Sequence, residues 1–378
     1  MGSNAAAPCH VVAVPYPGRG HINAILNLCR LLVAHDGSVS ATVVVTEEWL
    51  GLLGAAVAAD FGPRVRFETI PNVIPSEHGR AGDMVRAVST RMTVPFERLL
   101  DRLPPPAPSA IVADVFVPWA VDVGERRSVP ACVLCPISAT KFVVHYNFHR
   151  LPPAAASGGA SPVIDAADGT DPSLIGNYIP GLKSIKLSDL GPALANEKML
   201  KRILEAYTFV RRAQCVLFTS FHEFEGDAID VGRQDLHCPA YAVGPCIPFM
   251  ALQQHTAINP NEEAYMAWLD SQPARSVLYV SLGSFLSVSA TQLDEIAAGL
   301  AESKARILWT VHDAGRADGV IGREEIATAV GRLMSLDTAE AEEMRRRAKL
   351  LKDAAHATVE VGGSSWSDLT SFIKFISQ

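Results

Sequence analysis

Segments that favour β-strands alternate with segments that favour helices through the first part of the chain. The strands are expected at 10–15, 41–46, 65–70, 110–116, 131–135, 215–219 and 240–243. Apolar residues at helical spacing lie between most of them, at 22–35, 47–58, 81–102 and 197–212. This alternation predicts an α/β fold in which a parallel sheet carries helices on both faces. In such sheets, ligands bind beyond the carboxyl ends of the strands.

A second unit is expected after Gly244-Pro245, beyond a linker at 246–262. Only two further strands are predicted, at 277–283 and 306–311. Helical periodicity takes up most of the rest, up to Trp268-Leu269 and at 291–303, 323–334, 338–357 and 365–376. A two-stranded parallel sheet is too small to bury the apolar faces of so many helices. We therefore expect a second domain that lacks most of its strands and exposes apolar surface.

The length and composition suit a two-domain α/β enzyme. The chain has 378 residues, of which 48% are hydrophobic and 19% charged, and its formal net charge is −7. This negative charge argues against nucleic acid or an anionic membrane surface as the main partner. No apolar run is long enough to span a bilayer, and the N-terminus has no basic region followed by a long apolar core. A cytoplasmic monomer is expected.

The seven cysteines are scattered along the chain. Cys132 and Cys135 form a Cys-x-x-Cys, but they lie on the apolar segment 131–135 and no second pair accompanies them. We interpret them as buried small hydrophobic residues and not as a redox or metal site. No metal or resident cofactor is expected, and the cysteine pattern fits a reducing compartment.

Residues 15–23 read Pro-Tyr-Pro-Gly-Arg-Gly-His-Ile-Asn and connect the first predicted strand to the first predicted helix. His21 lies in the first turn of that helix, where the positive end of the helix dipole disfavours an imidazolium. A neutral imidazole at the end of a strand can accept a proton, although a capping or solvated histidine has the same local pattern. Gly18 and Gly20 are expected to let the backbone bend and approach a ligand closely.

Asp114 and the Gly283-Ser284 pair are expected at carboxyl ends of strands too. Asp114 ends the strand that begins at 110, so its carboxylate should lie near His21. Bonded to one imidazole nitrogen, it would fix the tautomer and stabilise the imidazolium, which makes His21 a general base for a hydroxyl. The alternative is that Asp114 caps the following turn. Backbone N–H groups near Gly283 and the Ser284 hydroxyl could hold a phosphate, although Gly-Ser is also ordinary turn chemistry.

A glycine-containing turn after a strand could also indicate a dinucleotide-dependent oxidoreductase. The segment Gly18-Arg19-Gly20-His21 does not continue into Gly-x-Gly-x-x-Gly, because residue 23 is Asn. We therefore disfavour this class.

Together these segments resemble a known family, the plant small-molecule glycosyltransferases that use UDP-sugars. The matching segments are 15–23, 111–119 (Ile-Val-Ala-Asp-Val-Phe-Val-Pro-Trp), 218–224 (Phe-Thr-Ser-Phe-His-Glu-Phe), 242–245, 268–284, 319–334 and 362–365. Their order and spacing run nearly the length of the chain. The resemblance implies a GT-B-like α/β fold with two Rossmann-like domains. The acceptor-binding domain would be 1–244 and the donor-binding domain 245–361, with a helix at 362–378 that packs back on the first domain.

The resemblance also implies roles for single residues. His21 would be the base that deprotonates a hydroxyl or carboxyl of the acceptor, and Asp114 would orient it. Gly20 and Gly283 would approach the UDP-sugar, which is a co-substrate. Ser284 would contact its diphosphate and Ser138 would lie near its sugar, expected to be glucose.

The implied acceptor is a small apolar molecule such as a flavonoid, a terpenoid or a hormone-like compound. Aromatic side chains near the expected site are candidates for its pocket: Tyr16, Phe116, Trp119, Phe142, Tyr146 and Phe148.

The chain departs from the family at the donor-binding signature. In the family this box starts Trp-x-x-Gln, continues through His-Cys-Gly-Trp-Asn-Ser and closes with Asp-Gln. This chain contains none of it and passes from the strand at 306–311 almost directly into 318–321. Two functions remain open: an inverting glycosyltransferase, and a truncated, catalytically inactive relative that binds aglycones or partner chains. A donor pocket supplies orientation and leaving-group stabilisation, so its loss should cost many orders of magnitude in rate.

Overall fold

The computed structural model describes residues 8–73, 81–152, 173–190, 197–247, 260–282, 289–310, 321–335 and 338–378. The chain forms two compact units. Unit 1 comprises Met1–Pro248 together with Ala354–Gln378, and unit 2 comprises Phe249–Asp353. The sequence placed domain boundaries after residue 244 and before residue 362. Unit 1 therefore also includes the last turns of a helix that begins in unit 2.

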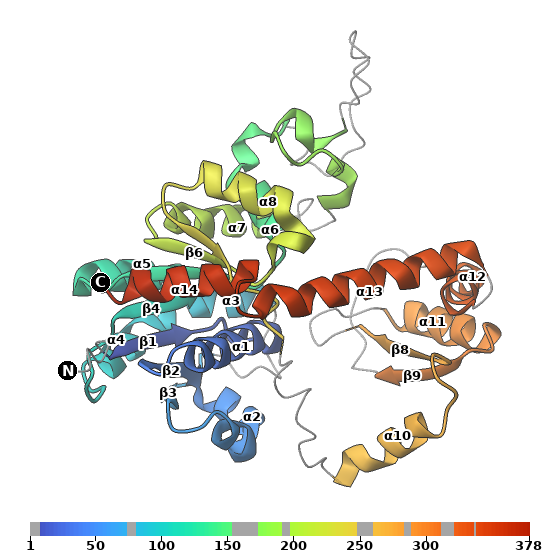
Figure 1. The fold of residues 1–378 in the computed structure, drawn as a ribbon, viewed down its shortest axis with the longest axis horizontal. Helices are drawn as coiled ribbons and strands as arrows, with labels where there is room; N and C mark the ends of the chain where they lie inside the picture. Colours follow the sequence, from blue (N-terminus) through green and yellow to red (C-terminus); the bar gives the residue numbers. More distant parts are fainter. Residues whose placement is uncertain are drawn as a thin grey trace. The chain divides into compact units, whose positions relative to one another are not determined.

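Unit 1 alternates strands and helices along the chain (Figure 1). Its strands are β1 (Cys9–Val14), β2 (Val39–Thr46), β3 (Val65–Ile70), β4 (Ala110–Asp114), β5 (Ala131–Cys135), β6 (Cys215–Phe218) and β7 (Ala240–Ala242). Its helices are α1 (Arg19–His35), α2 (Glu47–Asp60), α3 (Ala81–Arg91), α4 (Thr93–Leu100), α5 (Trp119–Arg127), α6 (Ala139–Tyr146), α7 (Glu197–Val210), α8 (His222–Asp235) and α14 (Ser364–Ile376). Short 3₁₀ turns are η1 (Phe148–Arg150), η3 (Ile175–Asn177) and η4 (Leu187–Leu190).

The seven strands form one parallel sheet in the order β3-β2-β1-β4-β5-β6-β7. Every strand predicted in this part of the sequence is present. Alternate strand residues point to opposite faces, so Val11 packs in one apolar cluster and Val12 in another. Helices α1, α2 and α14 contribute to the cluster on one face, while α3–α5 and α6–α8 contribute to two clusters on the other. Complete burial on both faces explains why β1, β4, β5 and β6 are almost continuously apolar, whereas the edge strand β3 is partly exposed and contains charged residues.

Two differences from the predicted helices have local causes. The helix expected at 81–102 is two helices, α3 and α4, which are separated at Met92. Pro95 has no N–H to donate to the carbonyl of Arg91, so an uninterrupted helix would lose a hydrogen bond there. Helices α5, α6 and α8 were not identified from the sequence, because each is short or is broken by an irregular residue. Within α8 that residue is Glu225, with φ −127° and ψ 35°.

The C-terminal helix α14 belongs to the core of unit 1. Its buried apolar side chains are Leu369, Phe372, Ile373 and Ile376. Polar contacts also join it to other elements: the Asp368 carboxylate accepts from Ala242 N–H at 2.6 Å, and Thr370 Oγ1 lies 2.8 Å from His35 Nε2. A segment far along the chain therefore completes one face of the sheet.

Unit 2 has a different construction. Its elements are α10 (Pro260–Asp270), β8 (Val277–Ser281), α11 (Ala290–Glu302), β9 (Arg306–Thr310), α12 (Arg323–Met334) and the first part of α13 (Ala339–Val359). Strands β8 and β9 pair in parallel and form the only sheet among its described residues. The strands and helices predicted here are present, but β8 ends at Ser281, before Leu282, which was expected to belong to it. Residues 283 and 311, the expected ends of the two strands, lie outside the described residues.

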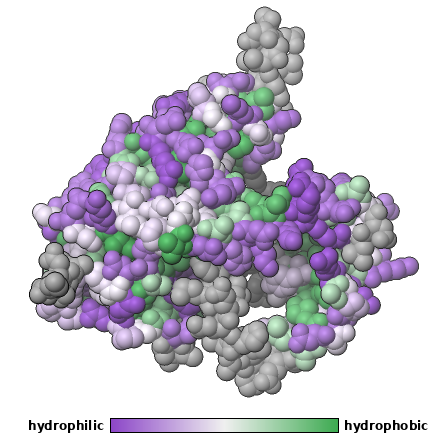
Figure 2. Space-filling view, in the orientation of Figure 1, coloured by the Kyte–Doolittle hydropathy of each residue, from purple (hydrophilic) through white to green (hydrophobic). Residues whose placement is uncertain are grey.

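The strands of unit 2 remain partly exposed along their whole length. No residue of β8 or β9 is fully buried, and Tyr279 is 61% exposed. Figure 2 shows hydrophobic surface over these two strands. Two connecting segments expected from the sequence, the loop at 151–172 and the linker at 246–262, lie mostly outside the described residues.

Candidate active site

His21 and Asp114 meet at the carboxyl edge of the sheet in unit 1. Nδ1 of His21 lies 2.7 Å from Oδ2 of Asp114. Strands β1 and β4 are neighbours in the sheet, so the residue that ends β4 and the helix that follows β1 come together. The hydrogen bond expected from the sequence is therefore present, between residues 93 positions apart.

The carboxylate of Asp114 is held on both oxygens. Oδ1 accepts the backbone N–H of Phe116 at 2.9 Å, while Oδ2 faces His21. The Asp114 side chain is fully buried, whereas the His21 side chain is 26% exposed. A carboxylate accepts only, so Nδ1 carries the hydrogen and Nε2 is left with a free lone pair when the ring is neutral. Within the described part of the chain, Nε2 has no hydrogen-bond partner. The predicted alternative, a turn cap by Asp114, is present on Oδ1 alongside the contact with His21.

Two aromatic rings flank the imidazole. The ring centroids of Tyr16 and Phe116 lie 5.1 and 5.8 Å from that of His21 and 6.4 Å from each other. Burial, and then the negative charge of Asp114, raises the pKa of Tyr16 to about 12, so the phenol stays neutral at physiological pH. The exposed side of His21 is thus bordered by neutral aromatic surface.

The two glycines before His21 lie at the start of α1, and their expected approach to a ligand stays a prediction. Gly18 precedes α1 in an extended conformation, and Gly20 lies inside the helix, which begins at Arg19 and not at Ile22. Neither has the positive φ that favours glycine. A Cβ on Gly20 would meet nothing within 4 Å, so the open space beside it leaves room for a ligand without requiring glycine.

Ser138, the residue expected near the sugar, lies after β5 at the same sheet edge. Its Oγ accepts the N–H of Lys141 at 3.1 Å, so it caps α6. The side chain is exposed, and its hydroxyl hydrogen remains able to donate. Contact with a sugar stays a prediction. Gly283 and Ser284 lie outside the described residues, so their expected contact with a diphosphate also stays a prediction.

Most of the other aromatic candidates belong to the core. Trp119 is 6% exposed and donates its indole N–H to the carbonyl of Val88 at 3.0 Å. Phe142 and Tyr146 are buried and stack on each other, and Phe148 packs against the same apolar cluster. Of the aromatic residues proposed for the pocket, only Tyr16 and Phe116 lie beside His21.

Two contacts that shape the site had no signal in the sequence. One is the backbone N–H of Phe116, which holds Asp114. The other is Glu225, whose two carboxylate oxygens accept N–H groups of Ala139 and Thr140, each at 3.0 Å. Both depend on how loops come together at the sheet edge, which residue spacing does not show.

Cys132 and Cys135 are buried free cysteines within β5. Among the described residues, no group of three or more His, Cys, Asp and Glu side chains is placed to hold a metal ion. No helix in the described part of the chain is long and apolar enough to cross a membrane.

The chain is similar in sequence to plant proteins of known class. UDP-glycosyltransferase 87A2 of Arabidopsis thaliana is 43% identical over 313 residues, which cover 79% of this chain and 64% of that protein. UDP-glycosyltransferase 87A1 of the same plant is 42% identical over 301 residues, covering 78% and 66%. The chain is homologous to plant UDP-glycosyltransferases. It spans slightly less than two thirds of the length of these two relatives. No protein-family model matches it.

Solved structures of such enzymes share the fold. Medicago truncatula UGT71G1 in complex with UDP-glucose superposes with a TM-score of 0.79 at 17% identity, covering 98% of each chain. A Polygonum tinctorium UDP-glucosyltransferase capable of glucosylating indoxyl, solved with 3,4-dichloroaniline, has a TM-score of 0.79 at 20% identity, covering 99% of this chain and 100% of that one. The α/β fold of the GT-B type expected from the sequence is confirmed.

Proposed function

We propose that this protein is a UDP-dependent glycosyltransferase and that His21 is its general base. The observation that carries the proposal is the 2.7 Å contact between His21 Nδ1 and the buried Asp114 carboxylate, which leaves Nε2 on the exposed side. Homology to plant UDP-glycosyltransferases supplies the reaction class. One relative is the 7-deoxyloganetin glucosyltransferase of Gardenia jasminoides, and glucose is therefore the sugar that we propose.

In the proposed reaction, Nε2 removes the proton from an acceptor hydroxyl or carboxyl as its oxygen attacks the anomeric carbon. The new C–O bond forms on the face opposite the diphosphate, the bond from the anomeric carbon to the diphosphate oxygen breaks, and UDP leaves with that electron pair. The configuration at the anomeric carbon is therefore inverted. Asp114 stabilises the imidazolium that forms and holds the ring in the reactive tautomer.

The surroundings of His21 suit an apolar acceptor. Tyr16 and Phe116 provide flat, neutral surface beside the reactive nitrogen. A phenol or a terpenoid alcohol could place its ring against this surface and its hydroxyl toward Nε2, so that binding orients the attacking oxygen. We propose acceptors of this class and no particular compound.

The donor side of the proposal rests on the sequence alone. Gly20 and Ser138 on unit 1, and Gly283 and Ser284 on unit 2, are the residues we propose for the UDP-sugar. Because the family's donor box is absent between 311 and 316, we expect no measurable affinity for UDP-sugar in the physiological range and little or no transfer by the chain as it stands. Isothermal titration with UDP tests this; tight binding would show that another surface binds the donor.

Product formation tests the base. Purified chain is incubated with UDP-glucose and a panel of phenols and terpenoid alcohols, and glucosides are quantified by mass spectrometry. His21→Ala should lower the rate by about 100-fold or more, because it removes the base of the proposed reaction. His237→Ala, at an exposed position in the same unit, is the matched control and should not change it.

If the parent chain forms too little product to measure, the same variants are made in a chain that carries a relative's segment between Val311 and Arg316. Transfer should then return in the parent and in the His237→Ala control but not in His21→Ala. Equal rates for His21→Ala and its control would refute the role of His21.

A further inference from the structure

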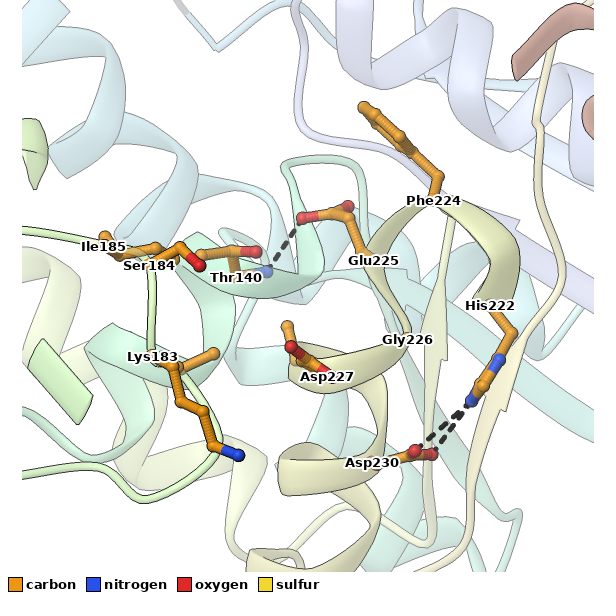
Figure 3. A pocket seen from close by; sticks show the side chains of 12 residues that line it. Thr140, Lys183, Ser184, Ile185, His222, Phe224, Glu225, Gly226, Asp227 and Asp230 are labelled. Carbon is orange, nitrogen blue, oxygen red and sulfur yellow. Dashed lines mark hydrogen bonds and ion pairs between the residues drawn. The ribbon is translucent and has the colours of Figure 1, made fainter. Parts of the chain in front are cut away.

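A cavity lies in unit 1, and its lining includes none of His21, Tyr16 and Phe116. Its volume is about 480 Å³, within the range of small-molecule sites. The start of α8, the first turn of α6 and the loop at 182–185 form its walls (Figure 3). Helix α6 follows β5 and helix α8 follows β6, so these two walls belong to the same carboxyl edge of the sheet as Asp114.

The walls are held in place by contacts that leave little freedom. The Glu225 carboxylate ties α8 to α6 by accepting the N–H groups of Ala139 and Thr140. On the opposite side, Gly181 has φ 104°, and a Cβ there would come within 2.5 Å of Val231 Cγ2 on α8. Only glycine permits this approach. Leu182, the next residue, is 2% exposed and anchors the loop in the core.

Groups of both charge signs border the cavity. Figure 3 shows Lys183 on the loop and Asp227 on α8 beside the same space. Among the described residues, neither side chain has an ion-pair partner. His222 and Asp230 form a separate pair at the rim, with Nε2 3.2 Å from Oδ1. The hydroxyl groups of Thr140 and Ser184 also line the cavity.

This lining excludes several classes of ligand. An anion such as a phosphate would meet the Asp227, Asp230 and Glu225 carboxylates beside a single lysine. A metal ion would find no group of three or more His, Cys, Asp and Glu side chains placed to hold it among the described residues. An apolar aglycone would have to strip water from Lys183 and Asp227 without replacing it, which is costly. A neutral molecule with many hydroxyl groups has none of these penalties, because each hydroxyl both accepts from an ammonium and donates to a carboxylate.

We propose that this cavity binds a neutral sugar, either free or as the sugar part of a glycoside. Lys183 donates to one sugar hydroxyl, Asp227 accepts from another, and Ile185 offers apolar surface to the C–H face of the ring. The proposal goes beyond glycosyl transfer by His21 and does not depend on it, since sugar binding here needs neither UDP nor turnover.

Binding is measured on the full chain by isothermal titration or ligand-observed NMR, with methyl β-D-glucopyranoside and phenyl β-D-glucopyranoside as probes. Saturable binding is expected for at least one of them. Lys183→Met and Asp227→Asn should each weaken it by about tenfold or more, the effect of losing a hydrogen bond to a charged group. Lys201→Met and Asp270→Asn, at exposed positions elsewhere, are the matched controls and should bind as the parent does.

The two probes distinguish the sources of the sugar. Tighter binding of the phenyl glycoside assigns the site to a glycoside, and equal binding assigns it to the sugar alone. His21→Ala should bind both as the parent does, which separates this site from the proposed active site. Absence of saturable binding, or undiminished binding by folded Lys183→Met and Asp227→Asn variants, would overturn the proposal. Free serine is a further probe, because Lys183 could bind its carboxylate and Asp227 its ammonium group. Stronger binding of serine than of the glucosides would also overturn the proposal. Thermal melting of each variant verifies that it is folded.

Discussion

The two sheets of this protein obey the same local rules and differ in what covers them. In unit 1, helices cover both faces of the seven-stranded sheet, and every residue of β1, β4, β5 and β6 is buried, whereas the edge strand β3 is partly exposed. In unit 2, the parallel pair of β8 and β9 has no fully buried residue. The tight contacts of unit 2 lie between its helices instead. A Cβ on Gly299 of α11 would come within 2.6 Å of the Arg323 carbonyl oxygen, and Gln292 exchanges two hydrogen bonds with the backbone of Ile321.

Apolar side chains are distributed accordingly. Eight of the thirteen large hydrophobic residues that are exposed among the described residues belong to unit 2, although unit 1 is more than twice as long. A strand–helix–strand sequence is therefore sufficient to form a pair of parallel strands. Burial of the side chains on that pair requires further strands or covering helices. The candidate active site lies on the buried sheet, because the contact between His21 and Asp114 requires β1 and β4 to be held side by side.

The largest expected effect is the loss of α14 from unit 1. Deleting 362–378 removes four buried apolar side chains, Leu369, Phe372, Ile373 and Ile376. Their burial contributes about 6 to 12 kcal/mol, as much as a typical domain's whole stability. Unit 1 should fail to fold cooperatively in denaturant titration monitored by near-ultraviolet circular dichroism. Removing only residues 377–378 is the control and should change little. An unaltered transition after the longer deletion would show that α14 is dispensable.

Aromatic truncation on matched strands compares the two sheets directly. Phe218→Ala on β6 removes a side chain that is fully buried, so we expect a loss of about 3–5 kcal/mol. Tyr279→Ala on β8 removes one that is 61% exposed, and we expect less than about 1 kcal/mol. Urea unfolding of both variants measures the difference. Similar losses would mean that β8 is covered in solution.

Acid should destabilise unit 1 through His145. Burial, and then the nearby charge of Lys141, lowers the pKa of His145 from 6.5 to about 4, and its Nδ1 is buried without a partner in the described residues. The fold keeps this imidazole neutral, whereas the unfolded chain binds a proton to it below pH 6.5. His145 therefore leaves the free energy of unfolding unchanged above pH 6.5 and lowers it as the pH falls from 6.5 toward about 4. The loss is about 3 kcal/mol. His145→Phe should flatten this part of the pH–stability curve.

A control variant restricts the interpretation of the acid experiment. His237→Phe replaces an exposed histidine of unit 1 and should leave the curve unchanged. A curve for His145→Phe that is as steep as the parent's would exclude His145 as the cause.

The smallest effect concerns the helix contact of unit 2. Gly299→Ala forces a methyl group against Arg323 and Ile326, and we expect a loss of about 1–3 kcal/mol. Gly331→Ala in α12 is the matched control, because a Cβ there meets nothing within 4 Å. It should gain up to about 1 kcal/mol from helix propensity. Calorimetry of both variants decides whether α11 and α12 hold unit 2 together.

The strands of unit 1, their parallel arrangement and the contact between His21 and Asp114 could be predicted from the amino-acid sequence. These follow from local periodicity and from one geometric rule, that the carboxyl ends of parallel strands share an edge. The position of α14 on unit 1 came from the resemblance to a family, since its own pattern shows only an amphipathic helix.

The tertiary structure alone decided which polar and aromatic residues are available to a ligand. The sequence makes all the aromatic residues proposed for the pocket equal candidates. Only Tyr16 and Phe116 lie beside His21, whereas Trp119, Phe142 and Tyr146 are buried in the core. Ser138 is engaged as a helix cap, and Lys183 and Asp227 come to border one cavity from distant parts of the chain. Burial and pairing are properties of contacts between elements, and residue spacing within one element carries no information about them.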